Sequence, residues 1–337
     1  MPPADFEAYS SHTYDAARNG SGQGERLIFV GGAPRSGTTL VQNMLDCHGE
    51  IYGGPEFLHI PDIVRMRSLL HGSIARKWID LICSHEQVDK ITATWIESFL
   101  LPLADSQGVR FLSEKTPMNV LVFPQLVELF PMARLIFVVR DPRAIVSSLL
   151  EVGARARAKS LEPPFFTKNL LSAILYTRDC LEKGFQAFEA VPERVYIVVY
   201  EKLVRAPLEE TKAICDFLQI AWEPSMLQPA RKQHAGEGAI TVFSDEIWYD
   251  AKAYYKDPDT DRVDRWRHQL SSTDQVTIAH WFRYSQELRA LGYDLSVAHY
   301  APMTRLFGVG KSQFLRYQRG LSSRLWQYLS RLQPPSP

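Results

Sequence analysis

A glycine-rich segment between a predicted strand and a predicted helix constrains this chain more than any other feature. Residues 26–30, Arg-Leu-Ile-Phe-Val, predict a buried strand, and the apolar side chains of Leu40, Met44 and Leu45 follow with helical spacing. The segment between them, residues 31–39, reads Gly-Gly-Ala-Pro-Arg-Ser-Gly-Thr-Thr. Glycines let the backbone approach an anion closely, and a helix N-terminus adds roughly half a positive charge. The arrangement predicts a phosphate-binding loop.

The loop departs from that of nucleoside triphosphatases at its cation. From Gly32 to Thr39 it keeps their spacing of glycines, but Thr38 stands at the lysine position and Arg35 supplies the positive charge. A guanidinium offers forked hydrogen bonds that suit a terminal phosphate better than a metal-bridged triphosphate. The loop therefore favours a phosphorylated ligand that is bound without a metal.

Apolar runs spaced along the chain indicate the fold class. These runs are nearly continuous rather than alternating, which is typical of parallel strands buried on both faces. Helical patterns separate them, and one begins at Pro207 with two acids in its first turn. The sequence predicts an α/β fold, a single domain over residues 25–298 with a P-loop-type parallel sheet flanked by helices. The predicted strands are 26–30, 109–113, 135–139 and 194–200, and the predicted helices include 144–150 and 167–190.

Three segments stand apart from this alternation. Residues 1–24 are polar and predict a flexible N-terminal tail. Residues 236–265 are too long for an ordinary connection, which leaves open whether they close over a ligand as a lid. Residues 299–337 form a basic aromatic C-terminal tail. This tail either packs back on the domain as a helix or contacts a membrane surface or a partner through residues 304–331.

Charge and cysteine content exclude some classes of protein. Thirty-eight Lys and Arg residues balance 38 Asp and Glu residues, which argues against a nucleic-acid binder held by an overall basic field. The four cysteines lack metal-ligand spacing, so we expect reduced thiols and no metal site. The N-terminal residues lack the apolar core of a signal peptide. We therefore expect a cytoplasmic protein.

The loop resembles the 5′-phosphosulfate loop of sulfotransferases that use 3′-phosphoadenosine 5′-phosphosulfate (PAPS). The matching residues are Pro34, Arg35, Ser36, Gly37, Thr38, Thr39 and Leu40. A second match begins at Arg140, at the end of a predicted strand, with Ser148 eight residues later. In the family, an arginine and a serine with this spacing hold the 3′-phosphate. The resemblance extends from about Arg26 to Asp294 and implies PAPS as the donor, 3′-phosphoadenosine 5′-phosphate (PAP) as the product and no metal.

Sulfuryl transfer to a hydroxyl requires a base and a cation at the reacting atoms. Glu56 belongs to a Gly/Pro-rich turn, and its position five residues before Pro61 resembles that of the base in the tyrosylprotein branch of the family. His59 is the competing base, since other branches use a histidine. Lys115 matches the family lysine that contacts the bridging oxygen of PAPS. The resemblance thus implies Glu56 or His59 as base and Lys115 as cation.

The resemblance constrains the donor more than the acceptor. Tyr200 and Arg265 match further family positions around the nucleotide. Leu58, however, stands where tyrosylprotein enzymes have an arginine, which favours a small-molecule, lipid or sugar hydroxyl as acceptor, with a tyrosyl protein as the alternative. Two other functions stay open. A divergent P-loop kinase would need Asp141 as its magnesium ligand, and an inactive scaffold would bind nucleotide without turnover.

Overall fold

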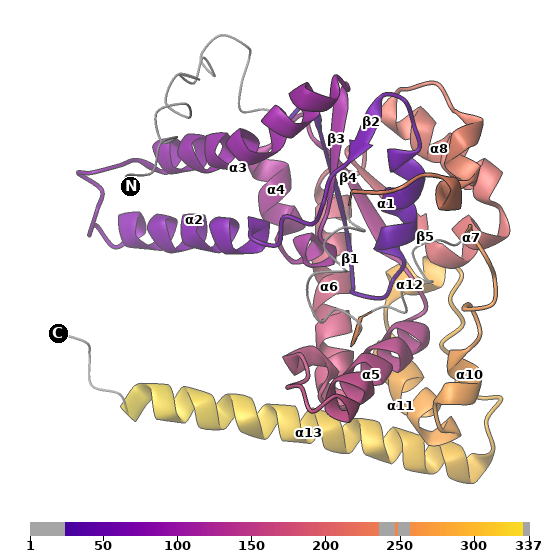
Figure 1. Ribbon diagram of the computed structural model, residues 1–337. Coiled ribbons are helices and arrows are strands. Elements are labelled where there is room, and N and C mark those ends of the chain that lie inside the picture. The colour runs from indigo at the N-terminus through magenta and orange to yellow at the C-terminus, as the bar shows by residue number, and fades with distance from the viewer. Residues whose placement is uncertain (1–23, 236–246, 249–256, 333–337) are drawn as a thin grey trace, which may run out of the picture.

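A five-stranded parallel sheet forms the centre of the protein, as the computed structural model of residues 24–235, 247–248 and 257–332 describes it (Figure 1). The order across the sheet is β2-β3-β1-β4-β5, and every neighbouring pair is parallel. This confirms the predicted fold class. The strands are β1 (Leu27–Gly32), β2 (Ile51–Gly53), β3 (Phe111–Lys115), β4 (Arg134–Val139) and β5 (Val195–Val199).

Helices connect the strands and cover both faces of the sheet (Figure 1). The longer helices are α1 (Thr38–Asp46), α2 (Ile60–Ala75), α3 (His85–Gln107), α5 (Pro142–Ala158), α6 (Leu170–Ala190), α8 (Pro207–Leu218), α11 (Ser272–Phe282) and α13 (Pro302–Leu332). The shorter ones are α4 (Phe123–Leu129), α7 (Tyr200–Arg205), α10 (Trp266–Gln269) and α12 (Gln286–Ala290). Single 3-10 turns span Pro117–Val122, Phe165–Thr167, Pro224–Leu227 and Pro229–Arg231.

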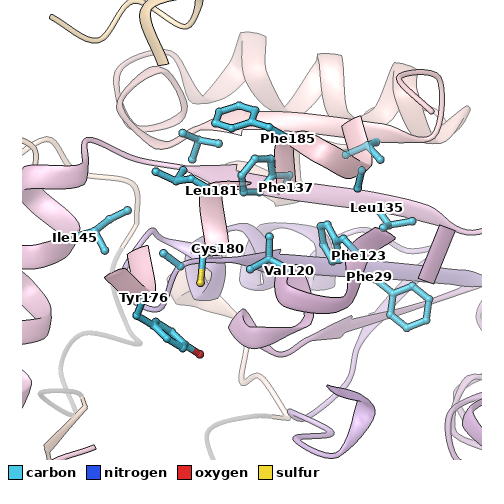
Figure 2. Packing of buried hydrophobic residues seen from close by; sticks show 14 of the residues in the cluster. Phe29, Val120, Phe123, Leu135, Phe137, Ile145, Tyr176, Cys180, Leu181 and Phe185 are labelled. Atoms are coloured by element: carbon cyan, nitrogen blue, oxygen red, sulfur yellow. The ribbon is translucent and has the colours of Figure 1, made fainter. Parts of the chain in front are cut away.

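Two buried clusters, one on each face, hold the helices to the sheet. On one face, Phe29 and Phe137 pack against residues of α4 and α6, as Figure 2 shows. A Cβ atom at Gly184 of α6 would collide with the ring of Phe137, so glycine is required for this close approach. On the other face, Ile28 and Val30 pack against α1 and α8. Burial on both faces explains the continuous apolar runs of the central strands.

The strands predicted over 26–30 and 194–200 are β1 and β5 with ends shifted by one or two residues, and Tyr200 begins α7. Two other strands differ more from the sequence-based prediction. The strand predicted over residues 109–113 is β3, which extends to Lys115 because pairing with β1 continues to the Val30–Lys115 position. Glu114 and Lys115 therefore lie inside a buried strand instead of following it. The short edge strand β2 was not predicted, because three residues are too few to show a period.

An antiparallel helical arm and the last helix extend from the same side of the sheet (Figure 1). Helices α2 and α3 lie side by side and form the arm, and Ser84 caps α3 with a capping box. Helix α13 packs along α11, where Gly308 lies against Val276. Within the described residues, no helix combines the length and hydrophobicity that crossing a bilayer requires. Residues 1–23 of the predicted N-terminal tail lie outside the described residues, as do most of residues 236–265, the segment considered as a lid.

Candidate active site

The phosphate-binding loop lies where the connections from two neighbouring strands run to opposite sides of the sheet. The connection after β1 leads toward β2 on one side of the sheet, whereas the connection after β4 leads toward β5 on the other side. In open α/β sheets, such a point creates a crevice at the carboxyl ends of the two strands. Arg35 follows β1 and Arg140 follows β4, so the two predicted phosphate-binding arginines meet at this crevice.

The loop backbone is tightly constrained. Arg35 has a φ of 75° and Gly37 a φ of 107°, both in the left-handed region. A Cβ atom at Gly37 would collide with the ring of Tyr200, so the loop fits against this ring only because residue 37 is a glycine. An arginine in the left-handed region is uncommon and requires support from its surroundings. Arg140 gives that support, because its Nη1 donates a hydrogen bond of 3.0 Å to the carbonyl oxygen of Arg35.

Side chains from distant segments converge on the loop. Arg35 donates from Nε to the Ser148 hydroxyl at 3.0 Å and from Nη1 to the Trp248 carbonyl oxygen at 2.7 Å. The guanidinium of Arg140 lies 4.4 Å from the centre of the Tyr200 ring, a cation–π contact. The structure thus brings together four residues that the sequence assigned to nucleotide binding from three separate segments.

Arginines surround a cavity of about 230 Å³ beside this cluster. The cationic lining residues are Arg35, Arg140, Arg155, Arg262 and Arg265, and one acid, Glu151, faces them. Arg265 had been assigned by resemblance, and it lies 3.8 Å from the Glu151 carboxylate. Arg155 and Arg262 were missed, because each stands in a stretch without a motif. Such a concentration of positive charge in a concave site favours a ligand with more than one negative group.

Two buried polar atoms at the crevice have no hydrogen-bond partner among the described residues. They are Oγ of Ser36, which is completely buried, and Nε of Arg140. Buried donors without partners are rare in folded proteins and call for an explanation, such as a ligand, an ion or an ordered water. The remaining loop residues stabilise the loop. Pro34 and Thr38 are buried, and Leu40 packs against the apolar residues around Tyr200.

Glu56 and Lys115 form an ion pair beside the phosphate-binding loop. Lys115 also lies 3.4 Å from the Thr39 hydroxyl, which connects the pair to the phosphate-binding loop. The turn that carries Glu56 follows β2 and is held where the Gly54 amide donates to the Ser113 carbonyl oxygen at 3.0 Å. The lysine side chain is buried and the glutamate side chain is 32% exposed. The acid therefore faces solvent while its partner does not.

His59, the competing base, lies outside this arrangement. Its side chain is 69% exposed, and Nδ1 is 3.7 Å from the Asp62 carboxylate, one turn along α2. Its ring contacts the ring of Phe57 edge to face. The geometry places Glu56, and not His59, in contact with the predicted catalytic lysine.

Glu114 is a buried acid next to Lys115 in β3, and the sequence pattern did not indicate its role. Its carboxylate accepts hydrogen bonds from the Phe57 amide at 2.9 Å, the Thr116 hydroxyl at 2.7 Å and the Asn119 side-chain amide. Burial nevertheless raises the pKa of Glu114 to about 7. Because Phe57 follows Glu56 directly, Glu114 fixes the backbone that presents the candidate base. An acid inside an apolar strand was the signal that could have identified it.

Asp141, the magnesium ligand that a kinase would need, has a structural role in this fold. Its carboxylate caps α5 through the Arg143 amide at 2.8 Å and forms an ion pair with the guanidinium of the same residue. The Asp141 amide in turn donates to Glu201 at 3.0 Å. The Arg143 guanidinium stacks on Trp266 at 4.2 Å. These contacts hold the Asp141 carboxylate in place as a structural part of the crevice.

The crevice, with its strained loop, clustered arginines and adjoining acid–lysine pair, belongs to an α/β protein and is suited to a ligand that carries phosphate groups. Comparison with known proteins makes this class specific. The sequence pattern of the sulfotransferase family matches residues 27–224, and the chain belongs to this family.

The similar curated proteins are tyrosylprotein sulfotransferases. Protein-tyrosine sulfotransferase 2 of Gallus gallus is 32% identical over 211 residues, which cover 60% of this chain and 53% of that protein. Protein-tyrosine sulfotransferase A of Caenorhabditis elegans is 27% identical over 293 residues, 86% of this chain and 73% of that protein. The match to the Drosophila melanogaster enzyme covers only 39% of its length. This chain thus spans about half the length of several relatives.

Solved structures share the fold. The sulfotransferase domain of the Synechococcus PCC 7002 olefin synthase superposes with a TM-score of 0.51 at 24% identity, covering 79% of this chain and 97% of that domain. The sulfotransferase domain of the curacin biosynthetic pathway gives a TM-score of 0.52 at 18% identity, covering 79% and 99%. At these identities the likeness concerns the arrangement of the sheet and its helices.

Proposed function

We propose that the protein transfers the sulfuryl group of PAPS to an acceptor hydroxyl. The observation that carries this proposal is that two sites meet at one phosphate-binding loop, since Arg35 lines the arginine cavity and Thr39 contacts Lys115. An arginine cluster suited to a nucleotide with two anionic groups adjoins the Glu56–Lys115 pair, and Thr39 of the loop contacts that lysine. Membership of the sulfotransferase family supports the same reading.

The residues of the crevice fit PAPS. Ser36 Oγ and Arg140 Nε are buried donors to which anionic oxygens would be suitable partners. In the proposed arrangement, the loop residues 34–40 hold the 5′-phosphosulfate, and Arg140 and Ser148 hold the 3′-phosphate. Each charge-assisted hydrogen bond contributes about 1.5–3 kcal/mol, which favours a 3′-phosphorylated nucleotide over ATP. When bound, PAPS supplies the activated sulfuryl group.

Glu56 removes the proton from the acceptor hydroxyl in this proposal. Its carboxylate is partly exposed, so an acceptor can reach it, and its contact with Lys115 keeps it beside the loop. Lys115 stabilises negative charge that develops on the leaving oxygen. His59 is the weaker candidate because its exposed ring pairs with Asp62, away from the lysine.

The kinase alternative has less support from the same residues. A magnesium-dependent site requires a carboxylate with free oxygens at the end of a strand. Both oxygens of Asp141 are engaged by Arg143, which lies in a buried ion pair with it. The cation of the loop is an arginine that also contacts Ser148 and the Trp248 carbonyl oxygen.

For the acceptor, we propose a small-molecule, lipid or sugar hydroxyl rather than a tyrosyl protein. The tyrosylprotein relatives support the tyrosyl alternative, but they are matched over only part of their length. Leu58 favours an acceptor other than an acidic peptide. It is half-exposed, two residues after Glu56, and offers an apolar contact where an acidic peptide would require a cation.

The test is transfer of radiolabelled sulfate from PAPS to a panel of alcohols, phenols, sugars and tyrosyl peptides. Wild type is compared with Glu56→Gln and His59→Ala, and PAP affinity is measured for all three by calorimetry. We expect Glu56→Gln to bind PAP normally and to lose about 10²–10⁴-fold in turnover. Normal turnover in Glu56→Gln with loss in His59→Ala would assign the base to His59. A failure of wild type to bind PAP would refute the proposed function.

A further inference from the structure

A stripe of apolar side chains leads away from the candidate base along the outer face of the helical arm. Ile91, Trp95 and Phe99 recur every four residues on α3 and therefore share one face of that helix. Their exposed fractions are 64%, 47% and 51%. Leu103, one turn further, lies close to Gly54 in the turn that carries Glu56. The stripe thus ends at the candidate active site.

Ring contacts join the stripe to Phe57, the residue after the candidate base. The ring centres of Phe57 and Phe99 are 5.1 Å apart, and those of Phe99 and Trp95 are 6.5 Å apart. The Phe57 amide is fixed by Glu114, and the residue before it is Glu56. We call Phe57, Phe99, Trp95 and Ile91, in this order from the base outward, the aromatic ridge. From Phe99 to Ile91 it extends about 12 Å along α3.

The aromatic ridge consists of apolar side chains, of which Phe99, Trp95 and Ile91 are open to solvent. An exposed apolar patch of this kind is typical of an interaction surface, and this one lies close to the candidate base. Leu58, half-exposed beside Glu56, adds to the same apolar border. A molecule that places a hydroxyl at Glu56 and extends along α3 would meet the apolar side chains of the ridge and, at its inner end, the imidazole of His59, whose ring contacts Phe57. An acidic peptide would find no electrostatic complement in them.

We propose that the aromatic ridge binds the apolar tail of the acceptor, so that the substrate class is an amphiphilic alcohol, a hydroxylated lipid. This inference rests on the proposed function and specifies its acceptor. The tail would contact the ridge equally in the ground state and in the transition state. Longer tails should therefore lower KM and leave kcat nearly unchanged.

The experiment measures sulfate transfer from PAPS to a series of primary alcohols from butanol to decanol. For wild type we expect kcat/KM to rise about two- to fourfold with each methylene that reaches the ridge. Trp95→Gln should lower kcat/KM for decanol at least about tenfold and leave butanol unaffected. The matched control is Trp78→Gln, because Trp78 is 70% exposed in the turn between α2 and α3, outside the ridge. It should behave as wild type.

A binding measurement separates this inference from the proposed function. Decanol is titrated by calorimetry into the PAP-loaded full-length protein and into both tryptophan variants. Binding that Trp95→Gln loses and Trp78→Gln keeps supports the ridge even if no alcohol is sulfated. The inference is overturned if decanol does not bind, or if transfer proceeds equally to butanol and decanol, or only to tyrosyl peptides. It is also overturned if Trp95→Gln alters only the oligomeric state.

Discussion

The raised pKa of Glu114 can be tested with the substitution Glu114→Gln, because glutamine resembles the protonated, uncharged form of the glutamate at every pH. Burial raises the pKa of Glu114 to about 7 from an ordinary value of 4.5. Between these values the folded protein binds a proton that the unfolded chain releases. Glu114 therefore contributes stability that is fully present below pH 4.5 and is lost as the pH rises through 7.

The magnitude follows from the two pKa values. A difference of this size corresponds to about 3 kcal/mol, of which roughly 2–3 kcal/mol develops between pH 5 and pH 8. Glutamine does not titrate. Its amide can also be accommodated, because the Asn119 side-chain oxygen has no partner among the described residues and can accept a hydrogen bond once the Asn119 amide rotates.

Urea unfolding of wild type and Glu114→Gln at pH 5, 6, 7 and 8 measures this effect. The free energy of unfolding of the variant, relative to wild type, should rise by roughly 2–3 kcal/mol across the series. Other titrating groups are common to both proteins and cancel in the difference. Glu189→Gln, at an exposed position of α6, is the matched control and should give a constant difference. A constant difference for Glu114→Gln as well would refute the reasoning.

Three further predictions concern the crevice and the last helix. Arg140→Ala should weaken PAP binding by about 10–100-fold, measured by calorimetry, because it removes a buried guanidinium, whereas Arg65→Ala on the exposed side of α2 should not. Gly37→Ala should also lower PAP affinity, since its Cβ would displace Tyr200. Gly308→Leu should cost about 1–3 kcal/mol in urea unfolding because its Cβ would lie 2.5 Å from Val276. Gly310→Leu, with open space at its Cβ, should cost little; equal losses would contradict the packing of α13.

The donor side of the crevice could be predicted largely from sequence because its parts are local. The loop follows β1 without interruption, and Arg140 and Ser148 are fixed relative to each other by the first turns of α5. Short-range spacing therefore determined which side chains point into the crevice. The contact between Arg35 and Ser148, by contrast, depends on the order of the strands, which spacing does not encode.

The acceptor side was less predictable, for physical reasons. Strand β2 forms because its three residues pair with β3. Its local sequence predicts a strand only weakly, so the pairing in the folded protein decides its structure. Glu114 stands among apolar residues of a strand, and its importance follows from burial, which composition does not give. Arg155 and Arg262 reach the cavity from a helix and a loop that lie more than a hundred residues apart. The arm of α2 and α3 was not predicted at all.

The position of β2 at the edge of the sheet places the two halves of the candidate site in different surroundings. The central strands β1 and β4 carry the residues assigned to the donor, and any alteration there disturbs packing on both faces. Glu56 and the arm of α2 and α3 occupy one continuous segment between β2 and β3, outside the central pair. The arm nevertheless enters the main core, since Ile60, Ile96 and Leu100 belong to the same buried cluster as Phe29 and Phe137. A substitution on the buried face of the arm should therefore lower the stability of the whole domain, whereas one on its exposed face should not.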